Sequence, residues 1–249
     1  MLKFLQGILF CLLFSASFQL FAKQELKIGV GNFPPFFIEE DQSGLFIEIT
    51  EAIFKRLPEY QIKFIFMSNS RLAHEINSGK LLDVACNIFA GSDVKGHLSK
   101  PIFRYTDVAV TQKSKNLAIN QVSDLKNLSI AAYQGAKELL GKELDIIAKN
   151  NPNYTEYSHP KETTYLLATG KKEVRIGDIN IFLYDLTNKQ YSNGMNIKRN
   201  DFTIHRLWPD VYSHMAFKDA TLRDAVDKII TELSSEGVLE QIYAKHHIN

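Results

Sequence analysis

Aromatic, amide and charged side chains follow directly after several apolar runs that predict β-strands. They lie at residues 32–33, 87–92, 134–137 and at Asp178. In α/β sheets, ligand sites gather at the carboxyl ends of strands, where the unpaired N–H groups of helix N-termini also lie. A carboxylate there can bind a cation, an aromatic ring can cover the ligand, and backbone N–H groups can bind an anion. We therefore take these positions as the candidate binding site.

Phe33 begins the segment Phe-Pro-Pro-Phe-Phe, residues 33–37. Proline fixes φ and has no N–H to donate, so the sequence predicts a stiff, extended loop. An aromatic ring held on such a loop could cover a ligand. Phe33 is the first candidate for this role, and Phe36 is the second. For Phe37 we expect core packing instead.

Asp178 ends the strand-like run Val-Arg-Ile-Gly and precedes a helix-like segment. A partly desolvated carboxylate at a strand end is a strong partner for a cation. It can equally act as a helix N-cap, which contributes about 1 kcal/mol. The two roles can coexist.

The elements that position these residues alternate between strand and helix patterns. Strands are predicted at 26–30, 60–67, 81–89, 128–135, 154–158 and 174–179, and helices at 46–57, 70–79, 136–149, 161–170 and 180–188. Alternation of this kind is typical of α/β units with mostly parallel sheets. The segments 103–113 and 204–218 read as extended connections between two blocks. A final amphipathic helix, capped by Thr221, has no sheet of its own and must pack on an existing lobe.

Composition limits the classes of partner. Residues 1–22 have one early lysine, a long apolar run and a small terminal alanine, the layout of a cleavable signal peptide. Removing Lys3 leaves 29 − 1 = 28 basic against 28 acidic residues, so no net charge attracts nucleic acid or an anionic membrane. Cys86 is then the single cysteine, and no intramolecular disulfide is expected.

Four stretches together carry a family likeness. They are LKIGVGNFPPFFIEEDQSGLFIEITEAIFKRL, DLKNLSIAAYQGAKELL, HPKETTYLLATGKKEVRIGDINIFLY and FKDATLRDAVDKIITELSSEGVLEQIYAKHH. In this order they resemble bacterial family 3 extracellular solute-binding proteins, the type II periplasmic binding proteins that serve polar amino acids. The likeness covers nearly all of residues 24–247.

The resemblance implies two α/β lobes, each a mixed, mostly parallel sheet flanked by helices, which close on a ligand about two hinge strands. Residues 23–107 and 208–249 would form lobe one, and residues 108–207 lobe two. Phe33 matches the aromatic residue that covers the ligand in relatives, and Asp178 matches the carboxylate that receives its α-ammonium. Phe46 replaces an aspartate that pairs with basic ligands, which disfavours a basic amino acid, although core packing explains Phe46 equally well.

The clamp for the ligand's carboxylate departs from the family pattern. Relatives carry an arginine after the third strand of lobe one, but residues 86–101 contain none. Counting from either side places Lys95 or Ser92 at that position, with Asn87 at the strand end, and Arg71 offers another anion partner. In lobe two, Ala136 and Lys137 replace the usual hydroxyl residues, and only backbone N–H groups remain to bind an anion.

The resemblance implies a periplasmic, monomeric receptor for an amino acid or related carboxylate. A membrane ABC permease is the expected partner, with no cofactor, metal or nucleic acid. A ligand-sensing partner of a membrane receptor is the alternative. A lyase acting on cyclohexadienyl acids on the same fold is a further one, for which Glu48 or Asp178 would serve as the acid.

Overall fold

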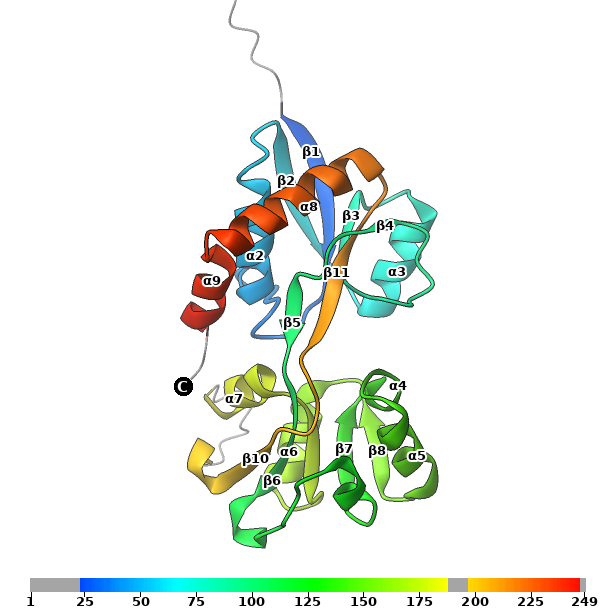
Figure 1. Ribbon diagram of the computed structural model, residues 1–249, viewed down its shortest axis with the longest axis vertical. Helices are drawn as coiled ribbons and strands as arrows, with labels where there is room; N and C mark the ends of the chain where they lie inside the picture. Colours follow the sequence, from blue (N-terminus) through cyan, green and yellow to red (C-terminus); the bar gives the residue numbers. More distant parts are fainter. Residues whose placement is uncertain (1–22, 188–196, 247–249) are drawn as a thin grey trace, which may run out of the picture.

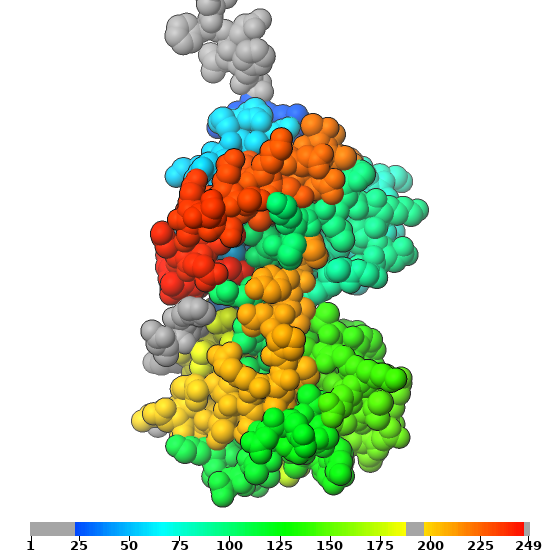
Figure 2. Space-filling model, viewed as in Figure 1, coloured from blue at the N-terminus to red at the C-terminus, as the bar shows by residue number. Residues whose placement is uncertain are grey.

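The chain forms two α/β lobes that are stacked along its long axis and joined by two extended connections (Figure 1). This computed structural model describes residues 23–187 and 197–246, so the predicted signal peptide lies outside the described residues. The space-filling view shows a narrow waist between the lobes, crossed by the second connection (Figure 2). The predicted α/β architecture is confirmed, with helices on both faces of two mixed sheets.

The sheet of lobe one combines parallel and antiparallel strands. Its strands are β1 (Gln24–Val30), β2 (Tyr60–Phe66), β3 (Val84–Phe89), β4 (His97–Leu98), β5 (Phe103–Tyr105) and β11 (Val211–Phe217). The order is β2-β1-β3-β11-β4, and β5 also pairs with β11. β1 runs parallel to β2 and β3, whereas β11 is antiparallel to its neighbours. β3 is buried up to its last residue, as its apolar sequence predicts.

Helices cover both faces of this sheet. They are α2 (Leu45–Phe54), α3 (Asn69–Ser78), α8 (Ala220–Ser235) and α9 (Val238–His246). Apolar residues of α2, α8 and α9 share one core with β1, while α3 packs in a separate cluster. The predicted cap of α8 is wrong: Asp219, not Thr221, is the N-cap, and its Oδ1 accepts the Leu222 N–H at 2.7 Å. A carboxylate two residues upstream reaches the free N–H groups first.

Lobe two has the same architecture, a mixed sheet covered by helices. Its strands are β6 (Asp107–Gln112), β7 (Ile130–Tyr133), β8 (Tyr154–Tyr157), β9 (Val174–Asp178) and β10 (Phe202–His205), in the order β10-β6-β9-β7-β8. Its helices are α4 (Ala136–Leu139), α5 (Lys142–Asn150), α6 (Pro160–Ala168) and α7 (Ile179–Thr187), with 3₁₀ turns at Lys113–Lys115, Val122–Leu125 and Arg199–Asp201. The single helix predicted at 136–149 is wrong. It is interrupted at Gly141, whose φ of 101° leaves the helical region.

Two connections join the lobes side by side. β5 ends at Tyr105 and β6 begins at Asp107, so the first crossing is at Thr106, while the second runs through residues 206–210. The Thr106 hydroxyl donates to Asp210 Oδ1 at 2.7 Å and ties the two crossings together. The amino end of β6 and the carboxyl ends of β7, β8 and β9 therefore form the edge of lobe two that faces lobe one. We call this the lobe-two edge, and the carboxyl ends of β1, β3 and β5 the lobe-one edge.

Candidate functional site

Phe33 lies on the lobe-one edge, three residues after β1. The predicted extended loop is wrong, because the Phe33 carbonyl accepts the N–H groups of Phe36 and Phe37 at 3.2 and 3.3 Å and closes a turn. The prolines have no N–H to offer, so the later residues supply the donors. The ring is half-buried and folds back over Gly31, where a Cβ would come within 2.2 Å of the Phe33 Cε1. The glycine thus makes room for the ring.

Phe36 and Phe46 are fully buried behind this turn. Their rings stack with centroids 4.3 Å apart, and both meet the Tyr105 ring edge-on. Phe37 also packs against Phe46. The core interpretation of Phe46 is therefore the one that the structure supports, and Phe36 is part of the same aromatic cluster.

Asn87 organises the centre of the lobe-one edge. It is 4% exposed and adopts a φ of 62°, a left-handed conformation that asparagine tolerates. Its Oδ1 accepts the hydroxyls of Tyr105 at 2.6 Å and Ser213 at 2.9 Å, and its Nδ2 donates to Asn69 at 3.2 Å. The amide thereby joins β3, β5, β11 and α3. Its Nδ2 carries a second N–H, for which no hydrogen bond is found within the described residues.

The predicted anion partners of lobe one lie at its surface. Arg71 has a side chain 60% exposed and pairs with Glu75 one helical turn away, at 3.3 Å. Ser92 and Lys95 are exposed in the loop after β3, where the Lys95 N–H donates to Asn77. Within the described residues, no hydrogen bond or ion pair joins these three side chains to Asn87.

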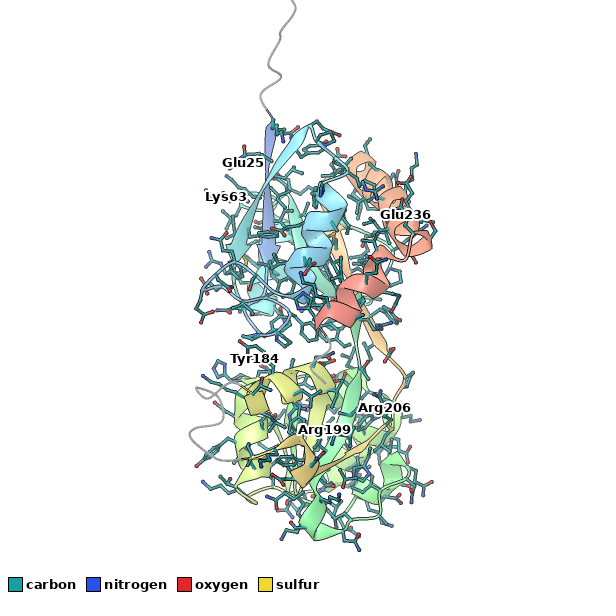
Figure 3. All side chains as sticks on the ribbon, turned by 90° about the vertical axis from the view of Figure 1, so that its left-hand side faces the viewer. Glu25, Lys63, Tyr184, Arg199, Arg206 and Glu236 are labelled. Atoms are coloured by element: carbon teal, nitrogen blue, oxygen red, sulfur yellow. The ribbon has the colours of Figure 1, made fainter. Side chains whose placement is uncertain are left out.

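Asp178 ends β9 on the lobe-two edge and is 3% exposed. Its Oδ1 accepts the N–H groups of Asn180 and Ile181, and its Oδ2 accepts that of Thr106 at 2.8 Å. Burial raises the pKa of Asp178 to about 6, against the lowering effect of these three N–H groups. The carboxylate thus caps α7 and ties it to the first crossing. Tyr184 of α7 lies on the side of lobe two that faces lobe one (Figure 3).

Asp107 is a further candidate for the site, which sequence analysis missed. It opens β6 directly opposite Asp178 in the antiparallel pair, and it is 3% exposed. The Tyr133 hydroxyl donates to its Oδ2 at 3.1 Å. Burial, and then the neighbouring Asp178 charge, raise the pKa of Asp107 to about 7.

Arg175 is the buried cation of lobe two, at 1% exposure. Its guanidinium donates to the Thr164 hydroxyl and to the Asp178 carbonyl, and lies 5.3 Å from the Phe182 ring centroid. Burial lowers its pKa, while the charges of Asp185, Asp178 and Asp107 oppose that shift. A charged residue within an apolar strand is the sequence signal that could have pointed to this centre, but sequence analysis gave Arg175 no role.

The loop after β7 holds Ala136 and Lys137, the predicted anion-binding positions. Ala136 is fully buried, and the Lys137 Nζ lies 3.6 Å from Glu138. The backbone N–H groups of Gly135 and Lys137 donate to the two carboxylate oxygens of Glu156 on β8, at 2.9 and 3.1 Å. The loop therefore binds a carboxylate, but one that the chain itself supplies.

Other chemical groups lie away from these edges. Glu48 is bound by Lys245 and His246 of α9, at 2.9 and 2.7 Å, so it holds the last helix to α2. Burial raises the pKa of the Cys86 thiol to about 12, which keeps it protonated. Within residues 23–187 and 197–246, no cluster of three or more His, Cys, Asp or Glu could hold a metal ion. No helix in the same part of the chain is long and apolar enough to cross a membrane.

Comparison with known proteins gives the same fold. The chain is 25% identical over 237 residues to the L-cystine-binding protein TcyJ of Bacillus subtilis (strain 168), covering 89% of this chain and 83% of that protein. It superposes with a TM-score of 0.71 on the GluR0 ligand-binding core in complex with L-glutamate, at 16% identity, covering 90% and 98% of the chains. A histidine kinase sensor domain similar to periplasmic binding proteins also gives 0.71, at 18% identity and 90% and 96% coverage.

These similarities identify the architecture as the type II periplasmic binding protein fold, two mixed sheets flanked by helices and joined by two strand connections. Residues 26–249 match a single family over almost the whole described chain. The protein belongs to the bacterial extracellular solute-binding proteins of family 3.

Proposed function

We propose that this protein is a periplasmic receptor that captures a small polar solute of the amino-acid type, bearing an ammonium group, between its two lobes. The observation that carries the proposal is the Asp178 carboxylate on the lobe-two edge, held in a fixed orientation by three backbone N–H groups. A carboxylate oriented in this way needs no reorganisation to bind an ammonium. The resemblance to an L-cystine-binding protein supports the ligand class.

Each edge supplies a different contact. Phe33 covers the ligand from lobe one, Asn87 offers its remaining amide N–H, and Asp178 receives the ammonium from lobe two. Arg71, Ser92 and Lys95 are the groups of lobe one, and Ala136 and Lys137 those of lobe two, that could approach another polar end of the ligand. Closure would bend the chain at Thr106 and at residues 206–210, where the lobes are joined.

The partner in this proposal is a membrane ABC permease that recognises the closed, monomeric receptor. A sensory role is the second candidate, supported by the fold shared with a histidine kinase sensor domain. Both roles use closure as the signal. A lyase is not proposed, because Glu48 is tied to α9 on lobe one and the Asp178 oxygens already accept three N–H groups.

Thermal unfolding of the purified chain with a panel of amino acids tests the proposal. A ligand present at a hundred times its Kd should stabilise the fold by about 2.7 kcal/mol. The same ligand should reduce the radius of gyration measured by X-ray scattering as the lobes close. If no amino acid or amine changes either quantity, the proposed function is wrong.

A further inference from the structure

The lobe-two edge holds more negative than positive charge. Asp107 and Asp178 share the guanidinium of Arg175, which leaves 2 − 1 = 1 formal negative charge uncompensated when all three groups are ionised; Asp185 lies within α7 and is also near the charge of Lys161. Among the described residues, no Lys, Arg or His nitrogen lies within 4.0 Å of the Asp107 or Asp178 carboxylate. Buried charges in proteins are normally paired. A bound cation would therefore stabilise the ionised form of this pair of carboxylates.

Asp107 has more free acceptor positions for such a cation than Asp178 or Asp185. Asp178 already accepts three N–H groups, and Asp185 accepts the Thr164 hydroxyl within the helix layer. Asp107 accepts only the Tyr133 hydroxyl, at Oδ2. Its Oδ1 accepts no hydrogen bond in the described part of the chain, although the side chain is 3% exposed. An ammonium has three donors and could be shared between Asp107 Oδ1 and the Asp178 carboxylate directly opposite.

The backbone N–H groups of this edge that could bind an anion already bind a side chain of the protein itself. The Gly135 and Lys137 N–H groups, which could donate to a ligand carboxylate, both donate to Glu156. The Tyr154 hydroxyl donates to the same carboxylate at 2.9 Å and fixes it in place. A ligand carboxylate at this loop would have to displace Glu156 and would meet its negative charge. In lobe one, Arg71 already pairs with Glu75 at the surface.

We infer that the ligand is an amine recognised by Asp107 together with Asp178, and that a free α-carboxylate contributes nothing to its binding. The preferred class is amines related to amino acids by loss of the carboxyl group. This inference rests on the proposed function, since it specifies the ligand of the same site. Asp107 sets the specificity, and Glu156 excludes the carboxylate.

Matched pairs of ligands test the inference by calorimetry on the full chain. The panel comprises the twenty amino acids, L-cystine and L-ornithine, each paired with its decarboxylated amine, such as cystamine for L-cystine and agmatine for L-arginine. In at least one pair, the amine should bind as tightly as the amino acid or more tightly. If every amino acid that binds loses more than tenfold in affinity on decarboxylation, the inference is overturned and the proposed function stands. If no member binds, both fail.

Two charge-removing variants test the residues, each with a matched control. Asp107→Asn should weaken amine binding at least tenfold, whereas Asp185→Asn, which also faces Arg175 but lies in α7, should change it less than threefold. Glu156→Gln should shift the ratio of amine to amino-acid affinity at least fivefold toward the amino acid. Glu173→Gln is its control, because Glu173 accepts the Ser129 N–H at the opposite end of the sheet. Equal effects of variant and control, with both proteins folded by circular dichroism, would overturn the assignment.

Discussion

The two edges that face each other across the waist differ in the chemistry of their side chains. On lobe one, Phe33 covers a core of stacked rings and the polar centre is a neutral amide, Asn87. On lobe two, Asp107, Asp178 and Glu156 gather carboxylates around strand ends. The first edge offers apolar area and the second offers charge. A ligand that satisfies both has an ammonium at one end and an apolar body at the other.

The difference also determines how each edge is stabilised. The lobe-one edge rests on packing, because Phe36, Phe37 and Phe46 have no exposed surface. The lobe-two edge rests on hydrogen bonds to buried carboxylates. Burial raises the pKa values of Asp107 and Asp178, and the Asp178 charge adds to the shift of Asp107. Substitutions in lobe one should therefore change stability, whereas those in lobe two should change ligand affinity and its pH dependence.

The largest effect is expected from removing the central ring of lobe one. Phe46→Ala should lower the free energy of unfolding by about 3–5 kcal/mol, because it opens a cavity between Phe36, Phe103 and Tyr105. Urea denaturation of the ligand-free protein measures the change. Tyr212→Ala, at a side chain that is 43% exposed, is the control and should cost under about 0.5 kcal/mol. A loss below about 1 kcal/mol for Phe46→Ala, no more than an average point substitution costs, would contradict the packed cluster.

Replacing Asp178 of lobe two should weaken ligand binding more than it lowers stability. Asp178→Ala removes the N-cap of α7 and should cost about 1–2 kcal/mol of stability. Its effect on ligand binding should be larger, about 2–5 kcal/mol or at least roughly 30-fold in Kd, because an ammonium loses its charged partner. Calorimetric titration of the folded variant measures the affinity. Asp124→Ala, which removes the capping carboxylate of a 3₁₀ turn elsewhere in lobe two, is the control and should leave Kd unchanged.

The sequence allowed one edge to be predicted better than the other. Asp178 and Phe33 were proposed as site residues because each follows an apolar strand. The helical spacing of Phe46 was compatible with either core packing or a place in the site. Asp107 was missed because it lies in a segment that reads as a connection, and its neighbour is set by the antiparallel register of β6 and β9. Glu156 reads as an outward-facing residue of an alternating strand until β8 is paired with β7. Long-range pairing, which no local pattern encodes, decides both positions.

The raised pKa of Asp107 predicts a dependence of stability on pH. An unfolded aspartate titrates near about 3.9, so between about pH 4 and pH 7 the folded protein binds the additional proton and its stability falls as pH rises. Asp107→Asn removes this penalty and should gain on the order of 2 kcal/mol relative to the wild type between pH 5 and pH 8. Denaturation curves at both pH values measure the difference.

Ligand binding provides a second way to measure the titration of Asp107. An ammonium beside Asp107 favours the ionised carboxylate, so binding near pH 6 should release a proton that calorimetry detects in buffers of different ionisation enthalpy. The other charged groups around it are Asp178 and Arg175 on β9, with Asp185 on α7, and they remain in the variant. Proton release of equal size in Asp107→Asn would assign the titration to one of those groups instead.

The smallest effects are expected from the cations on the rim of lobe one. Arg71→Ala and Lys95→Ala should each change stability by less than about 0.5 kcal/mol, because exposed ion pairs are screened by water and salt. Each should change the Kd of the ligand less than threefold, since both side chains are exposed and neither is hydrogen-bonded to Asn87 within the described residues. A loss of more than tenfold for an amino acid, with its decarboxylated amine unaffected, would place that cation on a ligand carboxylate. The contrast between the edges would then become one of opposite charges instead of apolar surface against charge.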